Sequence, residues 1–429
     1  MPPASTAADR LLEGDRAVAT ELAARVLKPR RDNLVERPWG GTGLRAFKGL
    51  PAAARSGAPI GESFEIAADD GDDEARRHPS VLTLADGSTI GLPALLAVHA
   101  ETLLGAPFVA RYGRRYPLLP KLLDVAELLS VQAHPPGNTE VYVIVAADVG
   151  ATIRLGFARD VAPEALAAQL HAGRREQQLL LELVTLPPDE LQALLKPWLA
   201  RRGAAPAELT SALQPRLAPA AHWRDVEASL AALQGVYWAA LDALNAVPVK
   251  AGDVIYNANP PRIVAQSGQP ASAEVHALGN TEGRAVLALE IRRPGPTYRA
   301  WDNVRFPLRA IDIEAALAAL NLRATRADEF VVTPRLVRPG VQRSVDCEYF
   351  RLEHLAPTAR AEIDVAVAAP HSLHVIEGRV ALTRRDGEDL GLLERGDSAL
   401  VPALVGAYRV AAIDEPAQLV KVELPPYVD

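Results

Sequence analysis

The chain has 429 residues, of which 49% are hydrophobic and 23% are charged, so it is long enough for two or three domains with a substantial core. Its 53 acidic residues outnumber its 46 lysines and arginines, and the net charge of −7 argues against a nucleic-acid partner. The single cysteine, Cys347, excludes an intramolecular disulfide and a thiolate metal cluster. We therefore expect a cytoplasmic protein in which histidine, glutamine and carboxylates would hold any metal.

The N-terminal segment, residues 1–29, predicts one helix. Residues 1–9 are small and polar and lack the basic and apolar pattern of a signal peptide, and no apolar run is long enough to cross a membrane. Apolar residues then recur at helical spacing between positions 10 and 27. We expect a single amphipathic helix there and no membrane association.

The middle of the chain alternates between strand and helix signals. Short apolar runs separated by Gly, Pro and Asp predict strands over residues 34–149, with one helix at Leu92–Leu104. Long stretches rich in Ala, Leu and Gln predict helices between 162 and 246. Strands resume from Gly252 to Ile291, and a short helix is expected at Ile311–Leu322. A helical block therefore interrupts a β domain.

The last hundred residues have the pattern of strands and glycine-containing turns that is typical of a cupin-type jelly roll. One predicted strand ends in Glu377-Gly378, and Gly396-Asp397 opens another that ends in Pro402-Ala403. The same Gly-Asp turn occurs earlier, at Gly252-Asp253. We expect a mainly β chain with an α insertion, that is, two cupin-type jelly-roll domains plus a helical domain. The expected divisions are an N-terminal helix at 1–29, a catalytic cupin at 30–154 and 247–310, a helical insertion at 155–246, and a C-terminal cupin-like domain at 311–429.

Four residues have the spacing of a metal site. Gln132 and His134 are two apart on a predicted strand and so share one face, and Glu140 follows across a short Pro-Pro-Gly turn. His276 lies in a strand far along the chain. Two imidazoles, a carboxamide and a carboxylate suit Zn²⁺ with an open position, and also Mn²⁺, Fe²⁺ or Co²⁺. The same histidines could instead be hydrogen-bonded strand residues, and spacing alone does not decide between these alternatives.

A longer motif resembles a known family. Residues 117–135, PLLPKLLDVAELLSVQAHP, resemble the signature of the type I phosphomannose isomerases. Further segments resemble that family in the same order, namely Arg37–Gly41 (RPWGG), Gly61–Glu65 (GESFE), Val275–Gly279 (VHALG), Leu289–Ile291 (LEI) and Thr297–Arg299 (TYR). The resemblance covers residues 30–150 and 248–305 well and the C-terminal region more loosely.

The resemblance implies an activity and a set of site residues. The activity is zinc-dependent interconversion of mannose 6-phosphate and fructose 6-phosphate through a cis-enediol, with a small-molecule sugar phosphate as the partner. One zinc ion per chain is implied on Gln132, His134, Glu140 and His276. The implied catalytic residues are Arg299, Glu290 and Lys121, and the implied substrate contacts are Lys121, Trp39 and Glu62. For the phosphate, Lys121 and an arginine from the stretch Arg111–Arg115 offer cations.

Each implied catalytic residue also has an ordinary structural interpretation. Lys121 could be a lysine whose stem packs on the surface, and Arg299 could be an ion-pair partner. Glu290 could be an edge carboxylate paired with Arg292. The sequence does not predict the oligomeric state.

Three departures bear on the substrate. The family's Lys-x-Glu tripeptide is Asn138-Thr139-Glu140 here, which removes a cation, and the loop between His134 and Glu140 is short. Residues 257–274 form a longer loop than usual, and a lid is expected there. The alternatives are an isomerase of another sugar, possibly unphosphorylated, and a non-catalytic, metal-containing carbohydrate-binding cupin. The presence of Glu290 and Arg299 favours an enzyme.

The C-terminal region contains a second pair of histidines. His371 and His374 are three apart, which places their side chains on opposite faces of a strand. Two ligands on opposite faces do not converge on one ion. We therefore expect the C-terminal domain to be structural and the metal to lie in the first β domain.

Overall fold

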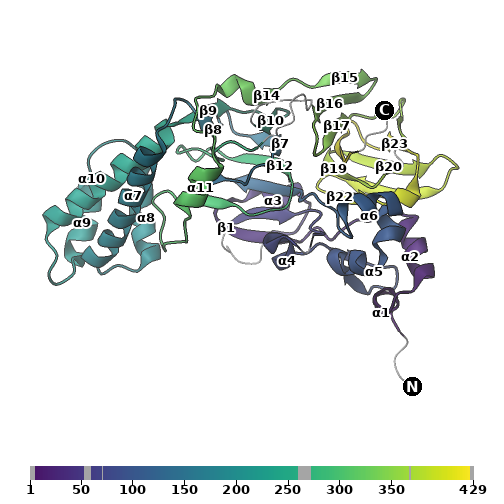
Figure 1. Ribbon diagram of the computed structural model, residues 1–429, viewed down its shortest axis with the longest axis horizontal. Coiled ribbons are helices and arrows are strands. Elements are labelled where there is room, and N and C mark those ends of the chain that lie inside the picture. Colours follow the sequence, from purple (N-terminus) through teal and green to yellow (C-terminus); the bar gives the residue numbers. More distant parts are fainter. Residues whose placement is uncertain (1–4, 53–58, 70, 259–271, 367–368, 426–429) are drawn as a thin grey trace.

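The computed structural model describes residues 5–52, 59–69, 71–258, 272–366 and 369–425 (Figure 1). The strands pair in antiparallel fashion in several sheets, and helices are about as abundant as strands. The chain is therefore a mixed α and β protein and not the mainly β chain that we expected, although strands and helices are both present in the expected parts of the chain. Among the described residues, no helix is both long enough and apolar enough to span a bilayer.

Two sheets form the first β region. The first sheet has the order β1 (Leu34–Gly41), β2 (Ile60–Phe64), β5 (Lys121–Val125), β12 (Val286–Arg292), β7 (Glu140–Ala147), β10 (Val254–Asn257) and β14 (Val331–Val332). The second has the order β13 (Tyr298–Trp301), β6 (Val131–Ala133), β11 (His276–Ala277), β8 (Thr152–Phe157) and β9 (Leu244–Pro248). Side chains of both sheets, such as Leu123 and Leu155, pack in one buried cluster between them.

Two further sheets form the second β region. The first of them has the order β15 (Arg335–Arg338), β16 (Val341–Asp346), β17 (Arg351–Leu355), β24 (Gln418–Glu423), β19 (His371–Glu377) and β22 (Ser398–Val401). The second has the order β18 (Ile363–Val365), β23 (Tyr408–Ala412), β20 (Arg379–Arg384) and β21 (Asp389–Glu394). Leu373 and Val410 belong to the core between these sheets. The predicted turns at Gly378 and Gly396 are confirmed, since both residues have the left-handed φ that glycine tolerates, +73° and +82°.

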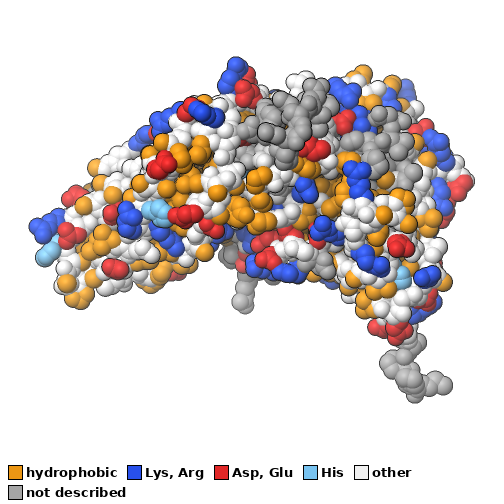
Figure 2. All heavy atoms as spheres, viewed as in Figure 1, with side chains coloured by type: hydrophobic (Ala, Val, Ile, Leu, Met, Phe, Trp, Pro, Cys, Tyr) orange, Lys and Arg blue, Asp and Glu red, His pale blue; other side chains and the backbone are white. Residues whose placement is uncertain are grey.

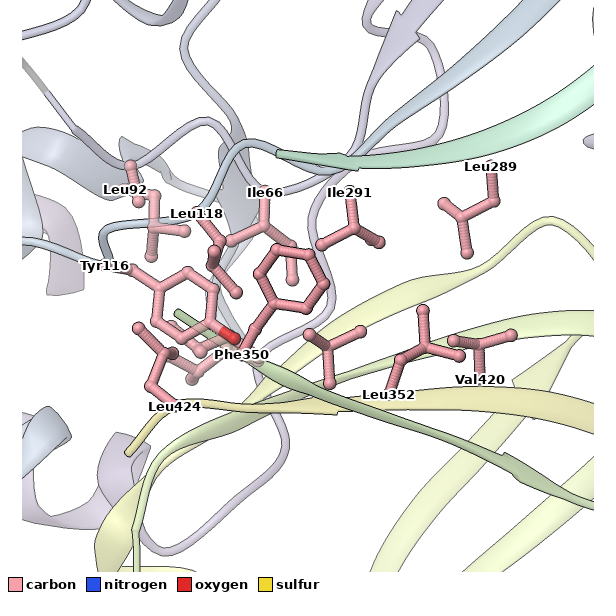
Figure 3. Close-up of a cluster of buried hydrophobic side chains, with 14 of the residues drawn as sticks. Ile66, Leu92, Tyr116, Leu118, Leu289, Ile291, Phe350, Leu352, Val420 and Leu424 are labelled. Carbon is pink, nitrogen blue, oxygen red and sulfur yellow. The ribbon is translucent and has the colours of Figure 1, made fainter. Parts of the chain in front are cut away.

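The central strand β12 has two different faces. Leu289 and Ile291 point toward Leu352 and Val420 of the second β region and pack with them in a large apolar cluster (Figure 3). Glu290 lies between them in sequence and, because side chains alternate along a strand, it points into the first β region instead. The two β regions are therefore packed against each other through β12 and its neighbours.

The N-terminus contains two helices, so the expected single helix over residues 10–27 is wrong. α1 (Ala7–Leu12) and α2 (Arg16–Ala23) are separated by Gly14, whose φ is +92°. The carboxylate of Asp15 accepts hydrogen bonds from the first backbone N–H groups of α2, Ala17 and Val18. This N-cap starts a new helix where the first one ends.

The remaining α-helices are α3 (Gly43–Phe47), α4 (Asp73–Arg77), α5 (Leu92–Leu104), α6 (Ala106–Tyr112), α7 (Pro163–Leu183), α8 (Pro188–Leu199), α9 (Ala207–Leu213), α10 (Trp223–Asp242) and α11 (Ile313–Ala319). There are 3₁₀ turns at Gln214–Arg216, Ala327–Phe330 and Ala403–Val405. Strands β3 (Val81–Thr83) and β4 (Thr89–Gly91) form a separate hairpin. α5 confirms the helix expected at Leu92–Leu104. α11 is shorter than expected because its N-cap is Asp312.

Helices α7 to α10 form an arm that projects away from the sheets (Figure 1). They lie between β8, which runs to Phe157, and β9, which begins at Leu244. Gly173 of α7 lies against the ring of Trp301 at the end of β13, where a Cβ atom would come within 2.5 Å of the ring. The arm is thus packed directly beside the strand that carries Arg299.

Candidate active site

One cavity of about 630 Å³ brings most of the expected site residues together. Its lining includes residues from β1, β2, β5, β6, β11, β12, β13 and α4. Seven expected residues line it, namely Trp39, Glu62, Lys121, Gln132, His276, Glu290 and Arg299. His134 and Glu140 are buried and lie within ion-pair distance of each other or of His276. In the space-filling view, acidic and basic side chains gather around α4, which contributes Asp73, Glu74 and Arg77 to the cavity (Figure 2).

Strand register sets three of these residues in a row. Gln132 of β6 is the direct partner of His276 on β11 and of Arg299 on β13. On the facing sheet, Glu140 of β7 is the partner of Asn257 on β10. Strands that are far apart in sequence therefore deliver His276, Gln132 and Glu140 to one place.

His134, Glu140 and His276 form a candidate metal centre. Each offers one ligand atom, and these atoms all lie within 4.8 Å of one another. His134 Nδ1 donates to the carbonyl oxygen of Pro296 at 3.1 Å, and His276 Nδ1 donates to that of Glu274 at 2.9 Å. Because a carbonyl oxygen can only accept, these contacts favour the tautomer in which Nδ1 carries the proton and the lone pair of Nε2 faces the centre.

These lone pairs fit a cation. His134 Nε2 lies 2.8 Å from Glu140 Oε1, and His276 Nε2 lies 3.4 Å from Glu140 Oε2. His134 Nε2 is buried without a hydrogen-bond partner among the described residues. Burial lowers the pKa of His276, although Glu140 raises it, which favours the neutral ring. Lone pairs that face a carboxylate repel it, and a divalent ion between them turns this repulsion into attraction.

Gln132 and two further residues surround the cluster. The amide nitrogen of Gln132 donates to Ser130 Oγ at 2.8 Å, which leaves its oxygen as the candidate fourth ligand. The hydroxyl of Tyr142 donates to Glu140 Oε2, and Asn257 Nδ2 donates to the same oxygen at 3.4 Å. We did not expect Tyr142 or Asn257 from the sequence. The alternation on β7 could have revealed Tyr142, since it lies two residues after Glu140 on the same face.

Lys121 and Glu290 form a buried ion pair beside this centre. The two residues are partners across β5 and β12, and Lys121 Nζ lies 2.7 Å from Glu290 Oε2 and 3.5 Å from Glu62 Oε1. Burial raises the pKa of Glu290 above its ordinary value, although Lys121 lowers it, and the nearby Glu140 adds to the rise. A carboxyl with a raised pKa is suited to accept and return a proton.

The neighbouring cations are also paired with carboxylates. Arg37 contacts Glu62 at 2.5 Å and Glu74 at 2.9 Å. Burial raises the pKa of Glu62, but Lys121 and Arg37 lower it below its ordinary value. Arg292 Nε lies 3.8 Å from Glu290. The ion pair with Arg292 that we considered as the structural alternative for Glu290 is therefore present, and the contact of Glu290 with Lys121 is shorter. Arg37 is a further residue that we did not predict as part of the site.

Two expectations for the phosphate region fare differently. Arg114 donates to the carbonyl oxygens of Ala97 and Val98, and Arg115 donates to that of Tyr112. Among the described residues that line the cavity, none comes from the stretch 111–115, so the cavity gives no support to a phosphate-binding arginine there. Lys121 does line the cavity.

The departures from the family pattern also have a structural place. Asn138 is buried, and its side-chain amide donates to the carbonyl oxygen of Arg293 at 3.2 Å, so it holds the loop after β12. Of the expected lid over 257–274, residues 259–271 lie outside the described part of the chain.

In the second β region, His371 Nε2 lies 2.7 Å from the hydroxyl of Tyr408, and both nitrogens of His374 contact serine hydroxyls. Both imidazoles are buried, and burial lowers the pKa of each to about 3. The two rings therefore have hydrogen-bonding partners within the protein.

Comparisons with known proteins give structural relatives only. No family model matches the chain. No curated protein matches it by sequence. Among solved structures, the mannose 6-phosphate isomerase of Bacillus subtilis is 20% identical, with a TM-score of 0.60 over 93% of this chain and 99% of that one.

Two other solved structures agree with this result. A mutant phosphomannose isomerase of Salmonella typhimurium is 17% identical, with a TM-score of 0.61 over 93% and 99% of the two chains. A mannose 6-phosphate isomerase bound with zinc and yttrium is 16% identical, with a TM-score of 0.58 over 93% and 98%. The chain therefore has the fold of the mannose 6-phosphate isomerases.

Proposed function

We propose that this protein is a zinc-dependent aldose–ketose isomerase that interconverts mannose 6-phosphate and fructose 6-phosphate through a cis-enediol intermediate. The observation that carries the proposal is the convergence in one cavity of a His134–Glu140–His276 cluster and a Lys121–Glu290 ion pair. The first is a metal centre for polarising a carbonyl group, and the second is a proton carrier with its own cation. The fold shared with mannose 6-phosphate isomerases supports the proposal.

Gln132, His134, Glu140 and His276 would hold one zinc ion, which when bound supplies a Lewis acid for the substrate's carbonyl oxygen. The proton must move between two adjacent carbons of the sugar. Glu290 takes it from one carbon and returns it to the other, and its raised pKa makes it a stronger base than an ordinary glutamate.

Four residues support this transfer. Lys121 holds the carboxylate of Glu290 through a 2.7 Å contact and neutralises it when it is ionised. Arg299, which lines the same cavity, stabilises the negative charge that develops on the enediol oxygens. Trp39 and Glu62 contact the substrate from the wall formed by β1 and β2, where Trp39 offers an apolar ring face and Glu62 accepts hydrogen bonds from hydroxyls.

We assign the site to a cupin-type jelly roll formed by residues 30–154 and 247–310. In the same plan residues 155–246 are a helical insertion, and 311–429 are a second cupin-like domain that holds no metal. The core between facing sheets in each β region supports this division. The protein would act in the cytoplasm on a small-molecule sugar phosphate.

One observation keeps a second substrate in view. Asn138 does not replace the charge of the family's lysine, and its amide is engaged with Arg293. An isomerase of an unphosphorylated sugar would use the same metal centre and the same proton carrier. A non-catalytic carbohydrate-binding cupin is disfavoured, because such a protein has no need of Glu290 beside Lys121.

The deciding experiment is a coupled assay of the purified protein on a panel of hexose and pentose phosphates and the matching free sugars. We expect turnover of mannose 6-phosphate that a chelator abolishes and Zn²⁺ restores. Turnover of free sugars alone would replace the substrate but keep the reaction. Binding without turnover of any sugar, in a protein shown to contain zinc, would refute the isomerase.

A further inference from the structure

Three arginines surround one buried carboxylate on the wall of the cavity. Asp302 follows directly after β13 and is only 2% exposed. Arg309 grips it with two nitrogens, Nε at 2.6 Å from Oδ2 and Nη2 on Oδ1. Arg305 Nη1 donates to the same carboxylate at 3.3 Å, and Arg299 Nε lies 3.9 Å from it.

These three arginines are not equivalent. Arg305 is buried and donates its other terminal nitrogen to the carbonyl oxygen of Leu128, so it is committed to the protein. Arg299 and Arg309 line the cavity, and about a third of each side chain is exposed. Arg299 Nε is also a buried donor without a hydrogen-bond partner among the described residues. One carboxylate therefore faces three guanidinium groups, and the two that reach the cavity carry excess positive charge.

The other cations of the cavity lack such an excess. Lys121 has Glu290 and Glu62 as partners, and Arg37 has Glu62 and Glu74. Arg292 also lines the cavity; it lies 3.8 Å from Glu290 and donates to two backbone carbonyl oxygens. The cations of that wall thus share several carboxylates, whereas Arg299 and Arg309 share one carboxylate with Arg305, so their wall is where an additional anion gains most. In agreement with this crowding, burial and the neighbouring Arg309 lower the pKa of Arg299, and Asp302 opposes them.

We infer that Arg309, held in place by Asp302, is a specificity-determining residue that binds the phosphate group of the substrate. This inference rests on the proposed function, and it assigns the phosphate to Arg309 and not to Lys121. It also provides a cation that compensates for Asn138, which points to the carbonyl oxygen of Arg293 instead. Asp302 acts through Arg309 and is a positioning residue.

The position of this wall suits the two ends of a sugar phosphate. Arg299 and His276 flank Gln132 on neighbouring strands, so their backbones are two strand spacings apart, about 10 Å. A hexose whose carbonyl end lies at the metal centre, with Arg299 at its enediol oxygens, has its sixth carbon several bonds further on, toward Arg309. The planar guanidinium of Arg309, already oriented by two hydrogen bonds to Asp302, is suited to a phosphate oxygen.

The test measures binding separately from turnover. Glucitol 6-phosphate and glucitol have no carbonyl group and cannot isomerise, so their dissociation constants report recognition alone. Arg309→Gln should weaken binding of glucitol 6-phosphate by about 10-fold to 100-fold, the usual effect of losing one charge-assisted contact, and change glucitol binding by less than about twofold. Asp302→Asn should weaken the binding of glucitol 6-phosphate by a smaller factor. Arg309→Lys should bind glucitol 6-phosphate more tightly than Arg309→Gln does, though less tightly than the unmodified protein.

Arg77→Gln is the matched control, because it removes one positive charge from the rim of the same cavity, where Arg77 is 67% exposed. Equal weakening by Arg77→Gln and Arg309→Gln would overturn the inference in favour of a general electrostatic effect. If Arg309→Gln weakened the binding of glucitol and of glucitol 6-phosphate equally, a change in pocket shape would explain the result and the inference would be overturned. Unchanged phosphate binding in a folded Arg309→Gln protein would overturn it directly.

A measurement on the unmodified protein covers the case in which the variants do not fold. Glucitol 6-phosphate should protect Arg309 from modification by phenylglyoxal in a peptide map, and glucitol should not. Modification of Arg309 that is insensitive to the phosphate contradicts the inference. If the protein isomerises only free sugars and binds both polyols equally, the phosphate subsite is wrong while the proposed reaction stands.

Discussion

Lys121 and Glu290 face each other directly across β5 and β12, with Lys121 Nζ 2.7 Å from Glu290 Oε2. The contact has opposite effects on the two groups. Burial lowers the pKa of Lys121, but Glu290 and Glu62 raise it above its ordinary value, and burial keeps the pKa of Glu290 raised in spite of Lys121. The pair therefore keeps a charged ammonium beside a carboxyl whose pKa lies above its ordinary value.

Glu290→Gln should remove the proton carrier and leave the pocket intact. We expect kcat/KM to fall by about 10²-fold to 10⁴-fold for phosphorylated and free sugars alike, because general acid–base catalysis contributes about that much. Steady-state kinetics with both substrates checks this, with zinc content as the control. A variant that retains more than a tenth of the activity would assign the proton transfer to another residue.

Lys121→Met should leave Glu290 without its close cation and leave Glu62 with Arg37 alone. Glu290 and Glu62 are 5% and 7% exposed, so this loss should destabilise the protein by about 3 to 5 kcal/mol, measured by denaturant unfolding. The double variant Lys121→Met with Glu290→Gln should be more stable than Lys121→Met alone, because the unpaired charge of Glu290 is gone. Additive destabilisation in the double variant would contradict the buried ion pair.

Activity should depend on pH through Glu290. The carboxylate must be ionised to accept the proton, so kcat/KM should rise with pH along a limb that lies above the ordinary pKa of a glutamate. Because the ammonium of Lys121 lowers the pKa of Glu290, Lys121→Met should move this limb to higher pH. A limb that stays in place, or moves to lower pH, in this variant would show that another group titrates.

The metal centre should depend on Tyr142 as well as on its direct ligands. His134→Ala and His276→Ala should abolish bound zinc, whereas Tyr142→Phe removes one hydrogen bond to Glu140 and should weaken zinc binding by about 10-fold to 100-fold. Competition with a chelator of known affinity measures this. His371→Ala is the control, since it lies in the second β region and should leave the zinc stoichiometry at one per chain.

The sequence predicted the site better than the outline of the fold. The motif ending at His134 identified β5 and β6, and the short turn to Glu140 could be judged from spacing. His276 is on a strand of only two residues, so its place in a strand made it a candidate ligand, and the family resemblance was needed to strengthen its connection to the others. The break between α1 and α2 at Gly14 was readable, but the helical periodicity on both sides concealed it.

Other parts of the site have no local signal in the sequence. Asp302 and Arg309 lie between the end of β13 and the start of α11, in a segment without helix or strand, and only the fold brings them to the cavity wall. Arg37 acquires its role from Glu62 and Glu74 on elements that fold against β1. Such groups are positioned by tertiary packing, and sequence patterns describe only neighbours along one element.

The two faces of β12 connect the C-terminal region to the proposed proton carrier, although that region contributes no residue to the candidate site. Leu289 and Ile291 pack in an apolar interface, while Glu290 between them pairs with Lys121 in the cavity. The second β region thus fixes the position of β12 from behind. A chain truncated before that region would expose this apolar face to water, and the side chain of Glu290 would no longer be held in a defined position.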